Sequence, residues 1–143
     1  MHICGASKLK NNHMAKVSSS IKNELYKVEI TSPSGNVLIA DEPVDVGGKN
    51  AGFSPNELLA SALAACTSAT LRMYADRKGW DLQEVLIDIE LDFFPEESKT
   101  IIRRTLKFSG DLDADQKTRL LAIANACPVH KILSNPIEIK TGF

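Results

Sequence analysis

Two of the three cysteines lie in sequence contexts that could support thiol chemistry. Cys66 falls within a run of small and apolar residues, whereas Cys127 begins the segment Cys127-Pro-Val-His130. Apolar surroundings raise the pKa of a thiol, so a reactive thiolate here would need a nearby cation. Each cysteine can equally be a small buried hydrophobic residue, and His130 is either a turn residue or a base. In a third interpretation Cys66, Cys127 and His130 bind zinc, because Cys-x-x-His is a permitted ligand spacing.

Two basic residues are candidates for the activating cation. Arg104 alternates with Ile102 and Leu106, which would place it on their apolar strand face, where a charge is costly unless it is paired or hydrated. The alternative is that its aliphatic stem is buried while its charged end reaches water. Lys49 lies in a glycine-containing segment and is otherwise a charged loop residue.

The spacing of apolar residues predicts an α+β fold with the order ββαββα and a final strand. Alternating apolar residues indicate two antiparallel hairpins, over about residues 23–39 and 85–108, and a last strand with Ile137 and Ile139 on one face. Ser54 and Pro55 mark the start of a long helix that we expect to end near Lys78. The helix therefore lies between the two hairpins in sequence.

A second helix is predicted to begin after Asp113, which forms a capping box with Gln116, and to end at Pro128. Cys127 would then lie at a helix C-terminus, where the helix dipole disfavours a thiolate. On this argument Cys66 is the more favourable attacking group, with Cys127 as its partner.

The long helix predicts a second subunit. Its first half, LLASALAAC (58–66), is apolar or small on every side, so we expect it to be a central helix that is buried all round. One antiparallel sheet covers only one side of such a helix, and its alanines and serines would allow another helix to approach closely. We therefore predict an obligate, interlocked homodimer with antiparallel sheets around central helices.

The composition excludes several classes of function. Seventeen Lys and Arg against 18 Asp and Glu give a net charge of −1, with no broad positive field to attract nucleic acid or anionic lipid. No unbroken apolar stretch approaches the roughly 20 residues that span a bilayer, and three cysteines do not suggest a disulfide-stapled secreted domain. We expect a cytoplasmic protein with neither nucleic acid nor membrane as a partner.

The first residues lack a structural pattern. We interpret residues 1–21 as a disordered leader and residues 22–143 as a single domain. The leader shows the spacing of apolar residues of neither a helix nor a strand, and it ends in a serine run. His13-Met14 is either a junction with residues added in cloning or the natural start. In the first case Cys4 has no functional role.

Four segments together resemble the OsmC/Ohr family of peroxide-reducing proteins (osmotically inducible protein C and organic hydroperoxide resistance protein), in its OsmC-like branch. They are SPNELL at 54–59, AACT at 64–67, GDL at 110–112 and ANACPVH at 124–130. The resemblance covers roughly residues 24–143. It implies an intertwined homodimer with two sites at its interface and a cytoplasmic stress-response function.

The resemblance also implies a two-cysteine, peroxiredoxin-like oxidoreductase that reduces organic hydroperoxides. Cys66 would attack as a thiolate, become a sulfenic acid, and be resolved by Cys127 as a disulfide. A dithiol, thioredoxin or lipoyl-type reductant would then restore the thiols. We expect neither a cofactor nor a metal for such a peroxidase.

The chain differs from the organic hydroperoxide branch at two points. In that branch a glutamate follows the motif proline and pairs with an N-terminal arginine, whereas here Asn56 follows Pro55 and no arginine precedes Arg72. Glu57 lies roughly 13 Å along the helix from Cys66 and fits a capping box better. The supporting residues considered are Arg104, Lys49, Asn56, Glu57 and His130. The alternative function is a non-catalytic dimeric module that binds a small apolar or thiol ligand and has buried, unreactive cysteines.

Overall fold

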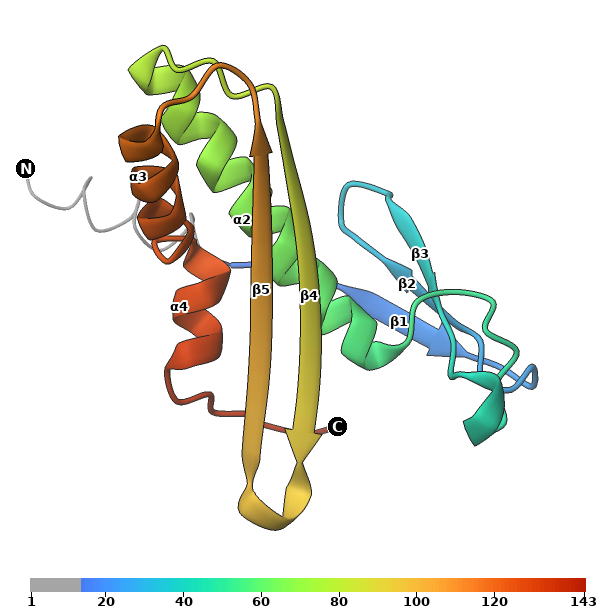
Figure 1. Ribbon diagram of the computed structural model, residues 1–143. Helices are drawn as coiled ribbons and strands as arrows, with labels where there is room; N and C mark the ends of the chain where they lie inside the picture. Colours follow the sequence, from blue (N-terminus) through green and yellow to red (C-terminus); the bar gives the residue numbers. More distant parts are fainter. Residues whose placement is uncertain (1–13) are drawn as a thin grey trace, which may run out of the picture. The chain divides into compact units, whose positions relative to one another are not determined.

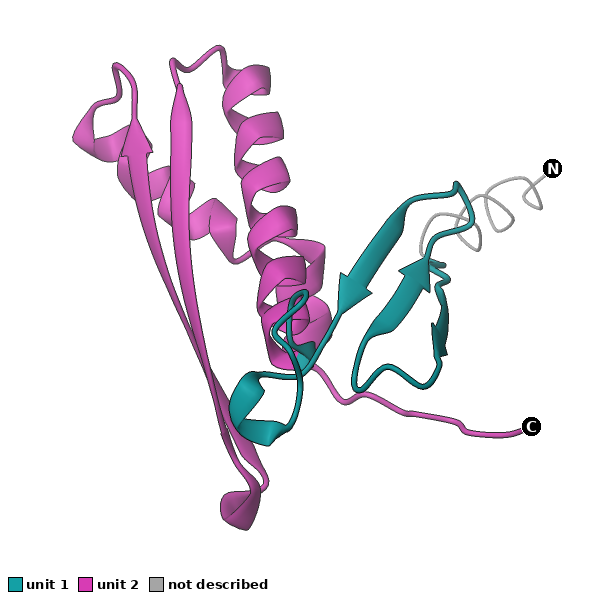
Figure 2. Ribbon diagram, turned by 90° about the vertical axis from the view of Figure 1, so that its right-hand side faces the viewer, with its two compact units in different colours: residues 1–55 teal, residues 56–143 magenta. Residues whose placement is uncertain are grey.

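The computed structural model describes residues 14–143, which form two antiparallel sheets and three α-helices (Figure 1). The chain divides into two compact units, residues 1–55 and 56–143 (Figure 2). The strands are β1 (Ser18–Ile21), β2 (Val28–Thr31), β3 (Val37–Ala40), β4 (Glu84–Phe94) and β5 (Lys99–Ser109). The helices are α2 (Pro55–Lys78), α3 (Ala114–Ala124) and α4 (Pro128–Ser134), and short 3-10 turns occur at Val44–Val46 and Pro95–Glu97. The mixed α+β class with antiparallel sheets is therefore confirmed.

The first unit contains a three-stranded antiparallel sheet in the order β1-β2-β3. The β2–β3 hairpin was predicted, although β2 begins at Val28 rather than Asn23. Ser18–Ile21 was expected to belong to a disordered leader, but it pairs with β2 as strand β1. All four residues of β1 are exposed, so the strand lacks the apolar alternation that would reveal it. Residues 1–13 of the predicted leader lie outside the described residues.

Asp41 organises the loop that follows β3. Its buried carboxylate accepts backbone hydrogen bonds from Tyr26 and Glu42 on Oδ1, and from Lys49 and Ala51 on Oδ2, at 2.7–3.1 Å. The bond from Ala51 is the largest cause that lowers the pKa of Asp41, and the other three bonds add to it against the effect of burial. This carboxylate therefore fixes the shape of the loop that carries Lys49.

Helix α2 begins at Pro55 and ends at Lys78, as predicted, and Gly79 follows with a left-handed φ of 68°. Within the single chain α2 is buried on one side only, and its burial all round, which was expected of a homodimer, stays a prediction. Its buried residues recur every four positions and form one stripe. Leu59 and Met73, on other sides of the helix, are 49% and 65% exposed. The stripe consists of Leu63, Thr67, Leu71 and Ala75.

Helix α2 is long and apolar enough to cross a membrane, as the central helix of a globular protein also can be. Both properties come from the run of small and apolar residues that predicted a central helix.

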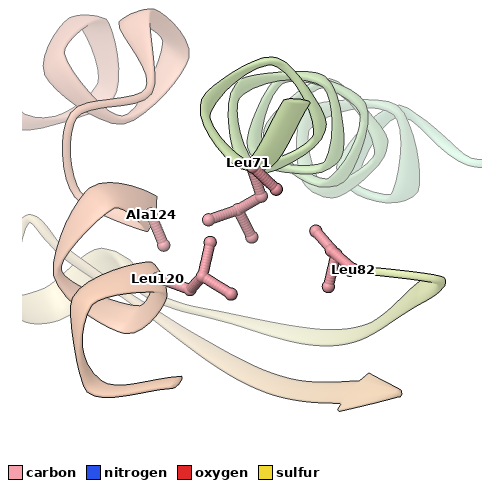
Figure 3. Close-up of a cluster of buried hydrophobic side chains, with 5 residues drawn as sticks. Leu71, Leu82, Leu120 and Ala124 are labelled. Atoms are coloured by element: carbon pink, nitrogen blue, oxygen red, sulfur yellow. The ribbon is translucent and has the colours of Figure 1, made fainter. Parts of the chain in front are cut away.

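Strands β4 and β5 form a long hairpin with eleven residue pairs, and α2 and α3 lie on one of its faces (Figures 1 and 2). The hydrophobic core lies between these elements (Figure 3). Its buried residues are Leu71, Ala75, Leu82, Leu120 and Ala124. Arg104 lies on the inner face of β5, and the adjacent Arg103 on the outer face donates to Asp92 at 2.8 Å.

The hairpin leads into α3 through a close backbone crossing at Gly110. A Cβ there would lie 1.9 Å from the carbonyl oxygen of Asp81, and Gly110 has a φ of 129°. Only glycine fits both conditions without a shift of the backbone. Asp113 and Gln116 then form the predicted capping box of α3.

The chain ends without the predicted final strand. Residues 135–143 form neither helix nor strand, and Ile137 and Ile139 are 60% and 84% exposed. A strand needs a partner for its backbone N–H and C=O groups, and no described strand of this chain pairs with this segment. The apolar alternation at its start therefore has no surface to cover within the single chain.

Candidate active site

Cys66 and Cys127 both belong to the second unit. Cys66 lies on α2 and is partly exposed, whereas Cys127 lies between α3 and α4 and is fully buried. Both are free thiols, and each of them shifts the pKa of the other. Loss of the proton from one thiol therefore affects the other.

The surroundings of the two sulfur atoms favour the negative charge on Cys127. Burial raises the pKa of the Cys66 thiol, and the hydrogen bond with Cys127 raises it further. Burial also raises the pKa of Cys127, but the Cys66 thiol, the backbone N–H of His130 and the Thr67 hydroxyl outweigh it, so the pKa falls below its usual value. In the reduced pair the proton is therefore held preferentially by Cys66.

The sequence predicted the opposite, namely that a negative charge is disfavoured on Cys127. That argument placed Cys127 at a helix C-terminus, where a thiolate is disfavoured. Cys127 is also the residue before α4, and the backbone N–H groups of Val129 and His130 both lower its pKa. Only the helix that ends before Pro128 entered the expectation for the thiolate, and the backbone N–H groups that follow Pro128 did not.

Arg104 holds three elements together beside the cysteine pair. Its Nη1 donates to the Thr67 hydroxyl at 2.9 Å, and its Nη2 donates to Asn125 Oδ1 at 3.0 Å. Nη2 also lies 3.2 Å from His130 Nδ1. The partners are a residue next to Cys66 and two residues that flank Cys127. Arg104, a predicted supporting cation, therefore contacts the residue after Cys66 and two residues close to Cys127 in the sequence.

A pocket of about 350 Å³ lies on the same side of the hairpin, next to Arg104. It combines apolar walls from Leu63, Ile102 and Leu133 with the polar ends of Arg104 and His130. Leu63 is about one helical turn before Cys66, and the backbone N–H of Val129, next to His130, contacts the Cys66 sulfur. The remaining lining residues are Thr100 and Ser134. The pocket can accommodate a small ligand with an apolar part and a hydrogen-bond acceptor.

The other three predicted supporting residues are Lys49, Asn56 and Glu57. Lys49 is in the first unit, where its Nζ lies 3.8 Å from Glu24. Asn56 and Glu57 are exposed in the first turn of α2, and the backbone carbonyl of Glu57 accepts a hydrogen bond from Ser61. As with Arg104, none of these three residues is among the causes that shift the pKa of either cysteine.

The zinc interpretation is not supported by the positions of the three side chains. Within residues 14–143, no three His, Cys, Asp or Glu side chains form a group that could hold a metal ion. His130 Nδ1 instead faces the Arg104 guanidinium, a cation. A metal ion that used this nitrogen would have to displace that arginine.

Sequence reasoning missed two polar residues of the site, Thr67 and Asn125. Thr67 is fully buried and donates to the carbonyl of Leu63 at 2.7 Å while it accepts from Arg104. A hydroxyl on the otherwise apolar stripe of α2 was the available signal, because buried polar groups require partners. Asn125 carried no comparable signal, because it lies at an exposed helix end.

Comparison with known proteins identifies a family match over most of the chain. The model of the OsmC family, described as OsmC-like protein, matches residues 47–142. No curated protein matches the chain. The match includes both cysteines, Arg104 and His130.

Solved structures with similar folds include an OsmC-like protein from Mycoplasma pneumoniae, at 18% identity and a TM-score of 0.71, covering 85% of this chain and 88% of that one. The organic hydroperoxide resistance protein OhrB of Bacillus subtilis is 24% identical with a TM-score of 0.60, and the match covers 89% of this chain and 95% of OhrB. A Vibrio cholerae protein with captopril bound in one of its active sites is 18% identical with a TM-score of 0.66, and the match covers 87% of this chain and 86% of that one. These similarities show that the fold is shared.

Proposed function

The chain belongs to the OsmC-like protein family, and from this premise we propose that it is a thiol-dependent peroxidase that reduces organic hydroperoxides in a cellular stress response. The observation that carries the proposal is the pair of free thiols, Cys66 and Cys127, each of which shifts the pKa of the other, in the unit that also holds Arg104 and its pocket. The names of related structures, which include an organic hydroperoxide resistance protein, support the same substrate class.

In the proposed reaction Cys66 attacks the peroxide, because it is the more exposed of the two sulfur atoms. The proton of Cys66 passes to Cys127, which leaves a thiolate on Cys66 that forms a bond to the terminal oxygen of the hydroperoxide. The O–O bond breaks, an alcohol leaves after protonation, and Cys66 becomes a sulfenic acid. Cys127 then attacks the Cys66 sulfur and releases water, and a thioredoxin- or lipoyl-type dithiol reduces the disulfide.

Arg104 is proposed as the cation of this site. The organic hydroperoxide branch uses an N-terminal arginine paired with a glutamate, and this chain has no arginine before Arg72. Arg104 uses three of the five N–H donors of its guanidinium on protein groups, which leaves two for a ligand. Its hydrogen bonds hold the charge in place before the substrate binds, so that no reorganisation is required during reaction.

We also propose that the active form is a cytoplasmic homodimer. The exposed apolar side of α2, with Leu59 and Met73, and the unpaired segment that contains Ile137 and Ile139 are surfaces that a second copy could cover. Sedimentation of the purified protein tests this proposal. A monomer at micromolar concentration would contradict it.

A mass measurement before and after one equivalent of cumene hydroperoxide tests the peroxidase proposal most directly. A Cys4→Ser background leaves only Cys66 and Cys127, so that loss of two hydrogens reports their disulfide. Cys127→Ser should instead gain one oxygen as a trapped sulfenic acid, and Cys66→Ser should abolish peroxide consumption with a dithiol donor. A wild-type protein no faster than Cys66→Ser would remove the proposal.

The second candidate function is a module that binds a small apolar or thiol ligand without turnover. The captopril molecule in an active site of the Vibrio cholerae relative favours this candidate, because it shows that a site of this fold retains a small molecule. The same mass experiment separates the two functions. No mass change with hydroperoxide, together with slow alkylation of Cys66, would favour the binding module.

A further inference from the structure

We propose that His130 is a catalytic hydrogen-bond donor, through its Nε2–H group, to the oxygen that leaves when the peroxide bond breaks, and that Arg104 fixes the tautomer required. This inference deepens the proposed peroxidase function and rests on it. It concerns the residue that faces the pocket from α4 rather than the two sulfur atoms.

The contact between Arg104 and His130 determines the position of the imidazole proton. Nη2 of Arg104 lies 3.2 Å from Nδ1 of His130. A guanidinium has only donors, so Nδ1 must accept this hydrogen bond, and the ring proton must reside on Nε2. The ring nitrogen that remains for a ligand is therefore a donor, while the ring itself is neutral.

The location of His130 suits contact with a bound peroxide. Its side chain lines the pocket of about 350 Å³ together with Leu63 and Arg104. Its backbone N–H contacts the Cys127 sulfur, and the N–H of the preceding Val129 contacts the Cys66 sulfur. The imidazole therefore belongs to the same turn of chain that positions both sulfur atoms.

The proposed step requires a donor at this place. The Cys66 thiolate gives an electron pair to the terminal oxygen of R–O–O–H, the S–O bond forms, and the O–O bond breaks with its electron pair on the R–O oxygen. The Nε2–H group of His130 donates a hydrogen bond to this developing alkoxide, which takes its proton from water, so the imidazole stays neutral. A donor aimed at developing charge commonly contributes a factor of about 10² to 10³ in rate.

Two substitutions separate the functions of the two ring nitrogens. His130→Asn keeps an acceptor near the position of Nδ1, so that Arg104 stays bound, but it removes the Nε2–H donor. His130→Gln places an amide N–H near the position of Nε2, but it loses the acceptor for Arg104. Lys131→Gln, at the exposed next residue, is the matched control.

The kinetic test compares two leaving groups, an alkoxide from cumene hydroperoxide and a carboxylate from peracetic acid. A carboxylate leaves readily without a hydrogen bond, whereas an alkoxide does not. We expect His130→Asn to lower kcat/KM about 10²-fold for cumene hydroperoxide and less than about tenfold for peracetic acid. His130→Gln should recover part of the lost rate on cumene hydroperoxide relative to His130→Asn.

The outcomes are distinguishable from failure of the proposed function itself. Equal losses on both substrates, or no loss on either one, would make His130 a structural residue and overturn the inference while the wild-type protein still consumed peroxide. If the wild-type protein consumed neither peroxide, the peroxidase proposal and this inference would fall together.

Discussion

Replacement of Arg104 by methionine tests whether its hydrogen bonds hold the candidate site together. Of its three acceptors, Asn125 is exposed and His130 is half-buried, so water can replace the arginine there. Thr67 is fully buried, and its oxygen would lose its only side-chain donor among the described residues. A buried acceptor without a donor costs about 1–3 kcal/mol.

The methionine side chain fits the apolar neighbours of Arg104, Ile102 and Leu106, and it removes a charge from this face, which offsets part of the loss. We therefore expect Arg104→Met to lower the free energy of unfolding by about 1–2 kcal/mol. In a Thr67→Val background no hydroxyl remains to be satisfied, and the same replacement should cost close to nothing. The expected coupling energy between the two positions is therefore about 1–2 kcal/mol.

Urea unfolding of the four proteins of this cycle measures the coupling, at one fixed protein concentration because association would add to apparent stability. Arg103→Met is the matched control, since Arg103 lies on the outer face in an exposed pair with Asp92. Such a pair is worth less than about 1 kcal/mol, and it should not couple to Thr67. Additive effects of Arg104→Met and Thr67→Val would refute the structural role assigned to this arginine.

Three further predictions concern the fold. Backbone hydrogen bonds hold the pKa of Asp41 below the ordinary 3.8, so the stability that Asp41 contributes is present above that value and is lost as the pH falls through the lower folded pKa. Urea unfolding from pH 5 downward should show this loss. Asp41→Asn should be less stable at pH 5, and its stability should depend less on pH in acid. Leu120→Ala should cost about 3–5 kcal/mol in urea unfolding, because Leu120 is fully buried in the core, and a loss below about 1 kcal/mol would contradict that packing. Gly110→Ala should cost at least about 2 kcal/mol by the same measurement, whereas Gly142→Ala, with open space around its Cβ position, should be neutral; equal stabilities would argue against the crossing at Asp81.

Elements with a local signal could be predicted from the sequence. Helix α2 was placed by Ser54 and Pro55 at its start, and α3 by its capping box at Asp113 and Gln116. The long hairpin followed from strict alternation of apolar residues, which also placed Arg104 on the inner face. In each case a few neighbouring residues determine the backbone, so a single sequence is sufficient.

Features that depend on distant partners could not be predicted in this way. Strand β1 is stabilised by pairing with β2, and the segment that contains Ile137 and Ile139 has the alternation of a strand but no partner among the described residues. Arg104 was a candidate because it alternates with apolar residues of its strand. Its partners, Thr67 and Asn125, lie on other elements and could be identified only from the structure. The electrostatics of Cys127 similarly depended on which helix its backbone neighbours join.

The register of the β4–β5 hairpin determines which of two adjacent arginines lies on the inner face and reaches Thr67, Asn125 and His130. Glu90 pairs with Arg103 and Ile89 with Arg104, and the strands are joined by the turn at Pro95–Glu97. A slip of one residue in β5 would turn Arg103 inward and Arg104 outward, together with the apolar residues on either side. A single residue inserted in this turn, which is far along the sequence from either cysteine, would therefore exchange Arg104 for Arg103 on the inner face. The length of a hairpin turn thus determines which arginine belongs to the candidate site.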